Sequence, residues 1–449
     1  MKKFAPYIFS ICMFFLFNSK LEFDNLSAAA ISIFFFWIAK LFIAANDYLP
    51  IKELFLSFYS LQYLFSPSLM YNGLEDYTIY PMKIPSDQYF NFIIPAFIIF
   101  SLGFAVFFKS SEFKVNQADI NKWLEKNSKV PFVFVAIGFI APFFYYFLPT
   151  QLNFIIYLLQ SFKYIGLFIL ISSTKKLNVL LLVAIYSFII VSSFVGGMFH
   201  DLLSWIVMLG LIISFRYKPK IHYKLIGITF FVVLAIFIQT LKKDLREKIW
   251  DEKSGASFEL ITSLAKDKFS GESFLPLVIF GEGVNRINQG WVLASTINNV
   301  PANVGHTHGE LITSYLFAAT LPRFLAPNKM QGGNTEYFNT YSGHTVNEQT
   351  VMVLGLFAEA YIEFENWGAY VYVFCFGLMY GYFLNTIKRN SKSYPILPLF
   401  ALLVFIYPIR PDCDTQTALG HLFKTSLFLF LMFKFFKDIF YQSYNSISE

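Results

Sequence analysis

The sequence predicts an all-α polytopic integral membrane protein, with about twelve transmembrane helices and one long helical loop on the outer side of the membrane. Composition is the first reason: hydrophobic residues make up 56% of the 449 residues, and charged residues only 14%. Soluble proteins of ordinary composition carry about 25% charged residues. The second reason is that the apolar residues gather into runs close to the length that crosses a bilayer. An ordinary set of soluble domains is therefore excluded.

The runs expected to span the bilayer follow one another along most of the chain. They lie at residues 4–18, 26–46, 53–70, 88–108, 130–148, 153–172, 177–195, 202–215, 225–240, 368–387, 394–408 and 421–437. The first run has a basic start and resembles a signal peptide, but no small-residue cleavage site follows it, so we expect an uncleaved span. The third run, 53–70, is the weakest because serines and a glutamine interrupt it.

Basic residues predict the orientation of these spans. If the N-terminus lies in the cytoplasm, the cytoplasmic segments hold about eighteen Lys and Arg residues, whereas the short outer loops hold only Lys20, Lys83 and Arg410. This bias predicts that both termini are cytoplasmic. It also supports the third span, because every later loop would change sides without it.

One region divides the chain into three parts. Nine spans are expected in residues 1–240 and three spans with a cytoplasmic tail in residues 368–449, and residues 241–367 lie between them on the outer side. Loops this long escape the charge rule, and a structureless loop of this length would be unusual. Helical patterning and short apolar stretches therefore predict a helical cap that lies on the outer face or dips into it.

An amide-rich stretch, NRINQGWVLASTINNVP at residues 285–301, stands out in this apolar chain. On a helix, Asn288 and Gln289 fall on the side opposite the apolar face that holds Trp291. Amides suit sugar hydroxyl groups, indole suits a sugar ring, and the guanidinium of Arg286 suits phosphate oxygens. The alternative is an amphipathic helix at the membrane surface, with its polar face in water.

Other segments of the outer region offer further candidates. The sequence H-T-H-G-E brings His306, His308 and Glu310 together, but this spacing is weak support for a metal site, and the cysteines supply no metal motif. We therefore predict no metal and regard Glu310 as a proton acceptor. Arg323 and Lys329 follow an apolar run, where basic residues also bind lipid phosphates non-specifically.

Two charged residues lie in strongly apolar surroundings. Glu359 shares a helix face with Gly355 and Glu363, and a carboxylate in so apolar a helix must be paired or face water. Glu363 and Glu365 lie near the end of this helix, where we expect them to be solvated. Lys163 lies near the middle of a span and should face a cavity or a partner.

In these motifs the chain resembles the polysaccharide repeat-unit polymerases of the Wzy type, also called O-antigen polymerases. The resemblance is carried by RINQGW and NNVP, the GE at 309–310, LPRFLAP-K, the GGN-x-x-YF of 332–338, the LG-x-x-AEAYIEF-x-x-WG of 354–368, the early DYLPIKELFLSFYSLQYLFSPSLMY and the IRPDCD hairpin. The chain departs from the family where GGMFHD offers only His200 for a common basic residue. It departs again where Glu363, Phe364 and Glu365 replace Asn-Phe-Gly.

The resemblance implies an enzyme of the bacterial inner membrane with a GT-C-like architecture and a periplasmic active site. Such enzymes transfer a growing glycan from one undecaprenyl diphosphate to the terminal sugar of another lipid-linked repeat unit, in O-antigen or capsule biosynthesis. They use no nucleotide sugar, and no cofactor is expected. The implied partners are the undecaprenyl-diphosphate-linked donor and acceptor and membrane lipids, with a chain-length regulator as a further candidate, but no nucleic acid.

The same resemblance implies roles for the candidate residues. Fixed cations should stabilise the leaving diphosphate, and a proton acceptor should activate the attacking hydroxyl group. The expected diphosphate-binding residues are Arg286, Arg323, Arg410 and Lys329, with Lys163 behind them. The expected catalytic residues are Glu359 as the base, Glu310 as the second choice, and Arg286, with His308 and His344 as further alternatives to the base. The expected sugar-binding residues are Asn288, Gln289, Trp291 and Tyr361.

Two other classes stay open at this point. A flippase for lipid-linked oligosaccharides has a similar number of spans, but it usually has short loops and often two similar halves, and no internal repeat is found here. An O-antigen ligase has a similar outer loop and differs in its acceptor, which is lipid A-core.

Overall fold

The computed structural model describes residues 4–74, 80–173, 183, 185–187, 189–190, 199–232, 263, 276–321, 329–330, 332–346 and 352–442. Helices alone, with no β-strand, make up the regular secondary structure of these residues. The predicted all-α class is confirmed for this part of the chain. Its long apolar helices are those of a protein embedded in a membrane.

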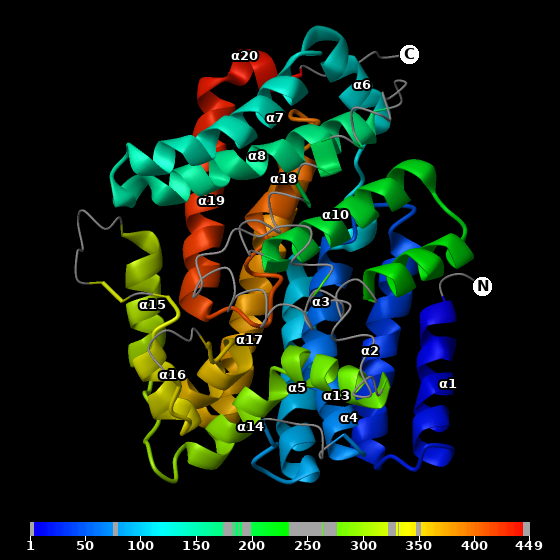
Figure 1. The fold of residues 1–449 in the computed structure, drawn as a ribbon, viewed down its shortest axis with the longest axis vertical. Helices are drawn as coiled ribbons and strands as arrows, with labels where there is room; N and C mark the ends of the chain where they lie inside the picture. The colour runs from blue at the N-terminus through cyan, green and yellow to red at the C-terminus, as the bar shows by residue number, and fades with distance from the viewer. Residues whose placement is uncertain are drawn as a thin grey trace.

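Most helices run along the long axis of the molecule in Figure 1, whereas those formed by residues 130–172 lie across them. The first part of the chain forms α1 (Ala5–Ser19), α2 (Asn25–Ala44), α3 (Ile51–Ser60), the π-helical turn η1 (Leu61–Phe65), α4 (Ser66–Tyr71), α5 (Ser86–Phe107), the 3-10 turn η3 (Ser110–Glu112), α6 (Gln117–Lys126), α7 (Val130–Ile140), the 3-10 turns η4 (Ala141–Tyr146) and η5 (Thr150–Leu152), α8 (Asn153–Ser172) and α10 (Phe199–Tyr217). The second part forms α13 (Pro276–Ile287), α14 (Gly290–Asn299), α15 (Glu310–Thr320), α16 (Thr335–Ser342), α17 (Leu356–Asn390), α18 (Leu397–Val404), α19 (Thr415–Phe435) and α20 (Lys437–Phe440).

Five helices of the described residues are long and apolar enough to cross a membrane; each overlaps an expected span, but the helix from Leu356 begins inside the predicted outer region 241–367. They are Asn25–Ala44, Ser86–Glu112, Asn153–Ser172, Leu356–Asn390 and Thr415–Phe435. A sixth candidate joins Gln117–Lys126 to Val130–Tyr146 through a bend of 83°.

The other expected spans take different forms. Residues 53–70 form α3, η1 and α4 in succession, and α18 has only eight residues. Three shorter apolar helices cover further runs: Ala5–Ser19, Leu203–Tyr217 and Ile221–Val232. Most of the run at 177–195 lies outside the described residues. The number of twelve spans therefore stays a prediction.

Close packing of α5 against α17 holds the centre of the bundle together. Gly377 and Gly381 lie one turn apart on α17, and each places its α-carbon against the backbone of α5. A Cβ atom on Gly377 would overlap the carbonyl oxygen of Phe100. Small residues at this spacing allow two membrane helices to approach closely. Aromatic rings then fill the space beside the crossing, as where Phe55 packs against Tyr380.

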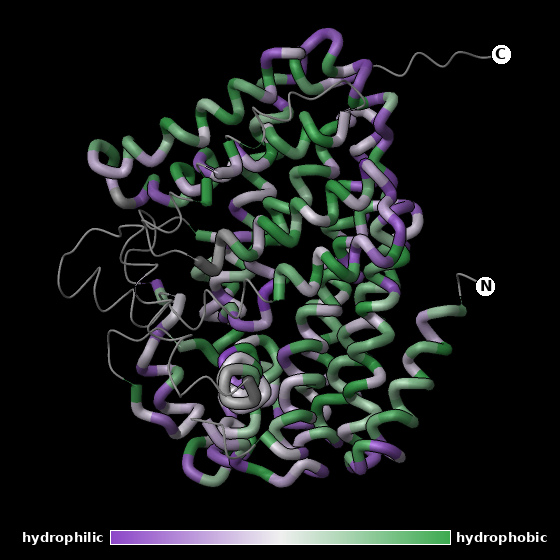
Figure 2. Tube along the Cα trace, turned by 45° about the vertical axis from the view of Figure 1, so that its right-hand side comes forward, coloured by the Kyte–Doolittle hydropathy of each residue, from purple (hydrophilic) through white to green (hydrophobic). Residues whose placement is uncertain are grey.

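Some of the segments predicted to face the cytoplasm contact one another at one end of the molecule. Lys388 forms an ion pair with Glu112 at 2.7 Å, and the indole of Trp123 donates to the carbonyl of Ile439. In Figure 1 this end carries α6 and α20, whereas α13, α14 and α16 lie at the opposite end. Figure 2 shows hydrophobic residues along the helices and hydrophilic residues towards both ends. The segregation agrees with the charge pattern; the side of the membrane that each end faces stays a prediction.

Lys163 is buried in α8, where this helix packs against α7. Its ammonium group lies 5.6 Å from the ring centre of Phe139 and 5.3 Å from that of Tyr164. Aromatic faces attract cations that are removed from water. The expectation that this lysine faces a partner is confirmed, and the partner is a pair of rings.

Candidate functional site

Helix α17 is broken at Glu365, where the backbone has φ 58° and ψ −156°. This region of backbone space is strained for any residue but glycine. Three donors from the loop before α15 bind the carbonyl groups just ahead of the break. The Nδ1–H of His306 donates to Tyr361 (3.0 Å), the N–H of Thr307 to Ile362 (3.1 Å), and the N–H of His308 to Glu363 (3.0 Å). The loop is therefore docked on the broken helix.

The Glu363 side chain also binds this loop, because its carboxylate accepts hydrogen bonds from it. Its exposed fraction is 0%, and its carboxylate accepts hydrogen bonds from the Thr307 hydroxyl (2.8 Å), the N–H of Gly309 (2.6 Å) and the N–H of Ile312. It thus caps the N-terminus of α15, where backbone N–H groups have no helical partner. The expectation that Glu363 is solvated is wrong, because these donors replace water. Glu365 is exposed, as expected.

We expect Glu363→Gln to lower the melting temperature of the purified protein in detergent, since a neutral amide satisfies these donors less well than a carboxylate. Loss of such charge-assisted hydrogen bonds costs about 1–3 kcal/mol. The matched control is Glu365→Gln, which removes the same charge two residues away from an exposed position. Equal melting temperatures for the two variants would contradict the capping role.

The H-T-H-G-E sequence serves this docking. His306 directs Nδ1 at carbonyl groups, while His308 is exposed and has a left-handed backbone with φ 51°. Glu310 is the exposed first residue of α15. Within the described ranges, no group of three or more His, Cys, Asp or Glu side chains is placed to hold a metal ion.

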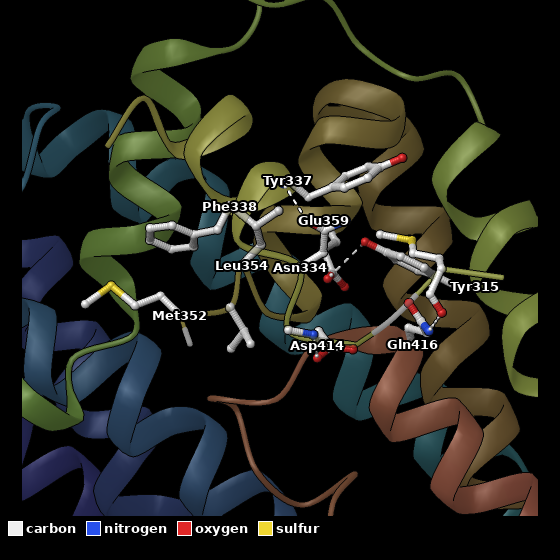
Figure 3. A pocket seen from close by; sticks show the side chains of 12 residues that line it. Tyr315, Asn334, Tyr337, Phe338, Met352, Leu354, Glu359, Asp414 and Gln416 are labelled. Carbon is white, nitrogen blue, oxygen red and sulfur yellow. Dashed lines mark hydrogen bonds between the residues drawn. The ribbon is translucent and has the colours of Figure 1, made fainter. Parts of the chain in front are cut away.

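A small pocket lies where α15, α16 and the first turns of α17 and α19 meet (Figure 3). Its described lining consists of Tyr315, Met330, Gly333, Asn334, Tyr337, Phe338, Met352, Val353, Leu354, Glu359, Asp414 and Gln416. Glu359 is 1% exposed; it accepts hydrogen bonds from the Tyr315 hydroxyl (3.3 Å) and the N–H of Thr415 (3.0 Å). The expectation that this carboxylate is paired or faces water is met by these two partners.

Tyr315 supplies the hydroxyl that contacts Glu359. Burial, together with the nearby charge of Glu359, raises the pKa of this phenol well above its ordinary value. The phenol therefore keeps its proton and acts as a donor at neutral pH. Sequence reasoning missed Tyr315, because nothing in LITSYLF distinguishes it from a core tyrosine.

Asp414 begins α19 and closes one side of the pocket. Its carboxylate accepts from the N–H (2.6 Å) and hydroxyl (2.9 Å) of Thr417, and from the N–H of Gly333 (3.1 Å). A Cβ atom on Gly332 would overlap the Thr417 hydroxyl. The glycines of the GGN sequence therefore allow the chain to pass close to the N-terminus of α19. The D-x-x-T capping pattern was the available sequence signal for Asp414.

Gln416 lines the pocket from the first turn of α19. Its amide nitrogen donates to the carbonyl of Met330 at 2.6 Å. Its amide oxygen is buried and has no hydrogen-bond partner among the described residues. Buried polar atoms almost always have a partner, so this oxygen identifies a place where a donor from a ligand fits.

The amide-rich stretch is buried in the protein. The Asn288 side chain accepts from the N–H of Gly290 (2.9 Å), Gln289 donates to the carbonyl of Val353 (2.9 Å), and Trp291 stacks on Tyr80 with ring centres 4.3 Å apart. The alternative of a polar face in water is therefore wrong for these residues. Gln289 therefore binds the carbonyl groups of the segment that leads into α17.

The predicted sugar-binding residues do not appear in the described lining of the pocket. Asn288, Gln289, Trp291 and Tyr361 are all buried, and Tyr361 packs edge-on against Phe92. Direct contact of these four side chains with a sugar stays a prediction.

His344 packs beside the amide-rich helix. Its Nε2 lies 3.1 Å from the Ser295 hydroxyl, and its ring meets Trp291 edge-on. Burial, and then the charge of Lys83, lowers the pKa of this imidazole. His344 is therefore neutral at physiological pH and serves packing and hydrogen bonding here.

The basic residues predicted to bind the diphosphate lie in different parts of the structure. Arg410 lies on the turn before α19, with its guanidinium 5.2 Å from the ring of Tyr407 and its Nε 3.8 Å from Asp412. Lys329 donates to the carbonyl groups of Ala318 (2.6 Å) and Leu321, so it caps the C-terminus of α15.

Of the remaining cations, Arg286 is exposed on the last turn of α13, and Arg323 lies outside the described residues. Lys424 is a cation that sequence reasoning missed. It lies 5.5 Å from the ring of Phe154, and it and Arg410 both interact electrostatically with His421.

Arg410 and the pocket share one turn of chain. The buried thiol of Cys413 interacts electrostatically with Arg410, Asp414 and Glu359. The thiol of Cys413 therefore lies within electrostatic range of both the guanidinium and the buried carboxylate. The fold and this site define a helical membrane protein with an acidic, amide-bearing pocket beside a cation at one end of its bundle.

No family model, no curated protein and no solved structure matches the chain. The resemblance to repeat-unit polymerases therefore rests on the motifs themselves.

Proposed function

We propose that the chain is a polymerase that joins undecaprenyl-diphosphate-linked repeat units at the periplasmic face of the bacterial inner membrane. In this proposal about twelve transmembrane helices surround the site in a GT-C-like arrangement. Both termini lie in the cytoplasm, and the end with α14, α15 and α16 faces the periplasm. The product is the polysaccharide chain of an O-antigen or capsule.

The observation that carries the proposal is the buried Glu359 carboxylate in the wall of the pocket. Glu359 lies in the AEAYIEF motif, and Asn334 and Asp414 come from the GGN and IRPDCD motifs. Motifs far apart in the sequence thus meet around one space. A positioned carboxylate within reach of a hydroxyl group is what general base catalysis requires.

The proposed step is one displacement at a sugar carbon. The hydroxyl oxygen of the acceptor forms a bond to the anomeric carbon of the donor glycan. The bond from that carbon to the diphosphate oxygen breaks, and the diphosphate leaves with the electron pair. The hydroxyl proton passes to Glu359, with Glu310 as the second choice for this base.

Cations stabilise the leaving group in this scheme. The diphosphate is already a stable anion, so no strong general acid is needed, but its growing charge must be balanced. Arg410 is the best placed, on the turn that carries Asp414, and Lys424 adds charge nearby. Arg286 and Arg323 keep the diphosphate-binding role assigned to them from sequence. The pocket and its flanking cation favour this scheme over a scaffold, which needs neither.

Deletion of the gene in the source bacterium tests this function. We expect surface polysaccharide with single capped repeat units and no long chains, because export and ligation of a unit do not require the polymerase. Naked lipid A-core would identify a ligase instead. Accumulation of the lipid-linked unit inside the cell would identify a flippase, and either pattern contradicts the proposal.

A further inference from the structure

The Glu359 carboxylate is covered on the side of the pocket. Glu359 is 1% exposed, and the space beside it has room for about one water molecule. Tyr315 from α15 and the N–H of Thr415 from α19 both contact the carboxylate (Figure 3). A general base must come within hydrogen-bonding reach of the hydroxyl group that it deprotonates. Direct contact between Glu359 and an acceptor sugar therefore requires one of the covering elements to move.

The loop before α15 binds acceptors that an unbroken α17 would use itself. In a continuous α-helix the carbonyl groups of residues 361–363 accept from the N–H groups of residues 365–367. Here they accept hydrogen bonds from the loop residues His306, Thr307 and His308. The docked loop and a continuous helix thus compete for the same carbonyl groups.

Gly368 permits the broken form of α17. A Cβ atom on Gly368 would lie 2.2 Å from the Cβ atom of Phe364, whereas residues four apart on a regular helix have Cβ atoms about 5–6 Å apart. The ring of Phe364 lies beside Gly309 of the loop, whose φ of 101° favours glycine. Any larger residue at position 368 therefore opposes the break, although a continuous helix accepts it.

Glu365 opposes the break as well. Its φ of 58° and ψ of −156° belong to a region that strains every residue but glycine. A continuous helix would remove this strain, because glutamate is an ordinary helix-forming residue. The hydrogen bonds of the docked loop are thus set against the backbone strain at Glu365, and α17 has two competing forms.

The docked loop also sets the position of Tyr315. Helix α15 begins at Glu310, directly after the loop, and Tyr315 lies in its second turn. The carboxylate of Glu363, two residues before the break, accepts from the N–H groups of Gly309 and Ile312 at the start of α15. Loop and helix start are therefore held together on α17, in the position that brings the Tyr315 hydroxyl to Glu359.

Resting on the polymerase function proposed above, we propose that the loop at 306–309 and the break at Glu365 form a latch that controls the access of the acceptor to Glu359. In the docked form α17 is broken and Tyr315 covers the carboxylate. In the released form α17 is continuous through residue 365, the start of α15 moves away, and the hydroxyl group of the acceptor reaches Glu359.

Hydrogen exchange of the full chain in lipid nanodiscs measures the latch without any turnover. The N–H groups of Thr307, His308, Gly309 and Ile312 donate to α17 in the docked form, so their exchange reports release of the loop. Mass spectrometry of the peptides that cover residues 306–312 gives the rate.

Two variants should change this rate in opposite directions. Gly368→Ala should speed the exchange at least about tenfold, because the added Cβ atom overlaps Phe364 only in the broken form. Glu365→Gly should slow the exchange about fivefold, because glycine relieves the strain of the break. Gly210→Ala is the matched control: it makes the same change on α10, where the added Cβ atom has no neighbour within 4 Å, and should leave the rate unchanged.

Labelling with dicyclohexylcarbodiimide, which modifies carboxyl groups in apolar surroundings, measures access to the base on the same samples. The rate of modification at Glu359, located by mass spectrometry, should rise in Gly368→Ala and fall in Glu365→Gly. Glu359→Gln provides the blank for this site. If Gly368→Ala fails to fold, Glu365→Gly tests the latch from the other direction.

Three results overturn the inference. The loop of Glu365→Gly exchanges as fast as that of the wild type, folded Gly368→Ala exchanges no faster than Gly210→Ala, or the labelling of Glu359 does not follow the exchange of the loop. Neither readout requires chain growth, so the test is separable from that of the function. A chain that shows the predicted exchange and labelling but never polymerises refutes only the polymerase.

Discussion

Replacing Glu359 with Gln should lower the rate of chain growth by about 10²–10⁴-fold, the range that a general base contributes. The amide keeps the size of the side chain and can still meet Tyr315 and the N–H of Thr415, so the fold and the binding of the lipid-linked donor should persist. The measurement is polymer length and rate in nanodiscs, with donor binding recorded on the same sample.

Glu310→Gln is the matched control for this variant. Glu310 is exposed and is not part of the described pocket lining, so we expect normal chains. If Glu359→Gln polymerises at the wild-type rate while Glu310→Gln does not, the base is Glu310 and the assignment to the pocket is wrong.

Replacing Arg410 with Ala should produce the second large loss, about 10²–10³-fold in rate, which is typical when one fixed donor to a developing negative charge is removed. Arg410→Lys should recover part of this rate, because the charge returns without the planar fork that matches phosphate oxygens. Chain growth and release of undecaprenyl diphosphate are measured together, after gel filtration has established that both variants are folded.

Arg286→Ala belongs in the same experiment, because the sequence assigns Arg286 to the same diphosphate. Arg286 is exposed on α13, whereas Arg410 is half-buried on the turn beside the pocket. A loss of long chains in Arg286→Ala, with normal chains in Arg410→Ala, would move the diphosphate site from this turn to α13.

Composition and periodicity were sufficient to predict the helical class and the places of five helices that are long and apolar enough to cross a membrane. The length of an apolar run is a local property of the sequence, so no tertiary contact is needed to find it. They were also sufficient to single out Glu359, because a carboxylate between alanines in an apolar helix requires a partner. Composition and periodicity could not identify which residues form hydrogen bonds with Glu359. Tyr315 is 44 residues away and Thr415 is 56 residues away, so only the packing of α15 and α19 against α17 brings them together.

Glu363 was misread for the same reason. By position it resembles a solvated residue at a helix end, but the break at Glu365 lets the loop at 306–309 dock there and bury it. The alternative of a solvated surface for the amide-rich stretch fails for a similar reason, because periodicity defines a polar face and not what covers it. Asn288 and Gln289 meet backbone groups of the protein instead. Gln416 carried no sequence signal, since a glutamine becomes informative only when its oxygen is buried without a donor.

The central claim is that this chain forms glycosidic bonds between lipid-linked repeat units. The most direct test is to reconstitute the purified full chain in lipid vesicles with a single lipid-linked repeat unit and no nucleotide sugar. We predict a ladder of products in which one undecaprenyl diphosphate is released for each unit added. Units that cross the bilayer without any new bond, or units that stay unchanged in a preparation that binds them, would contradict the claim.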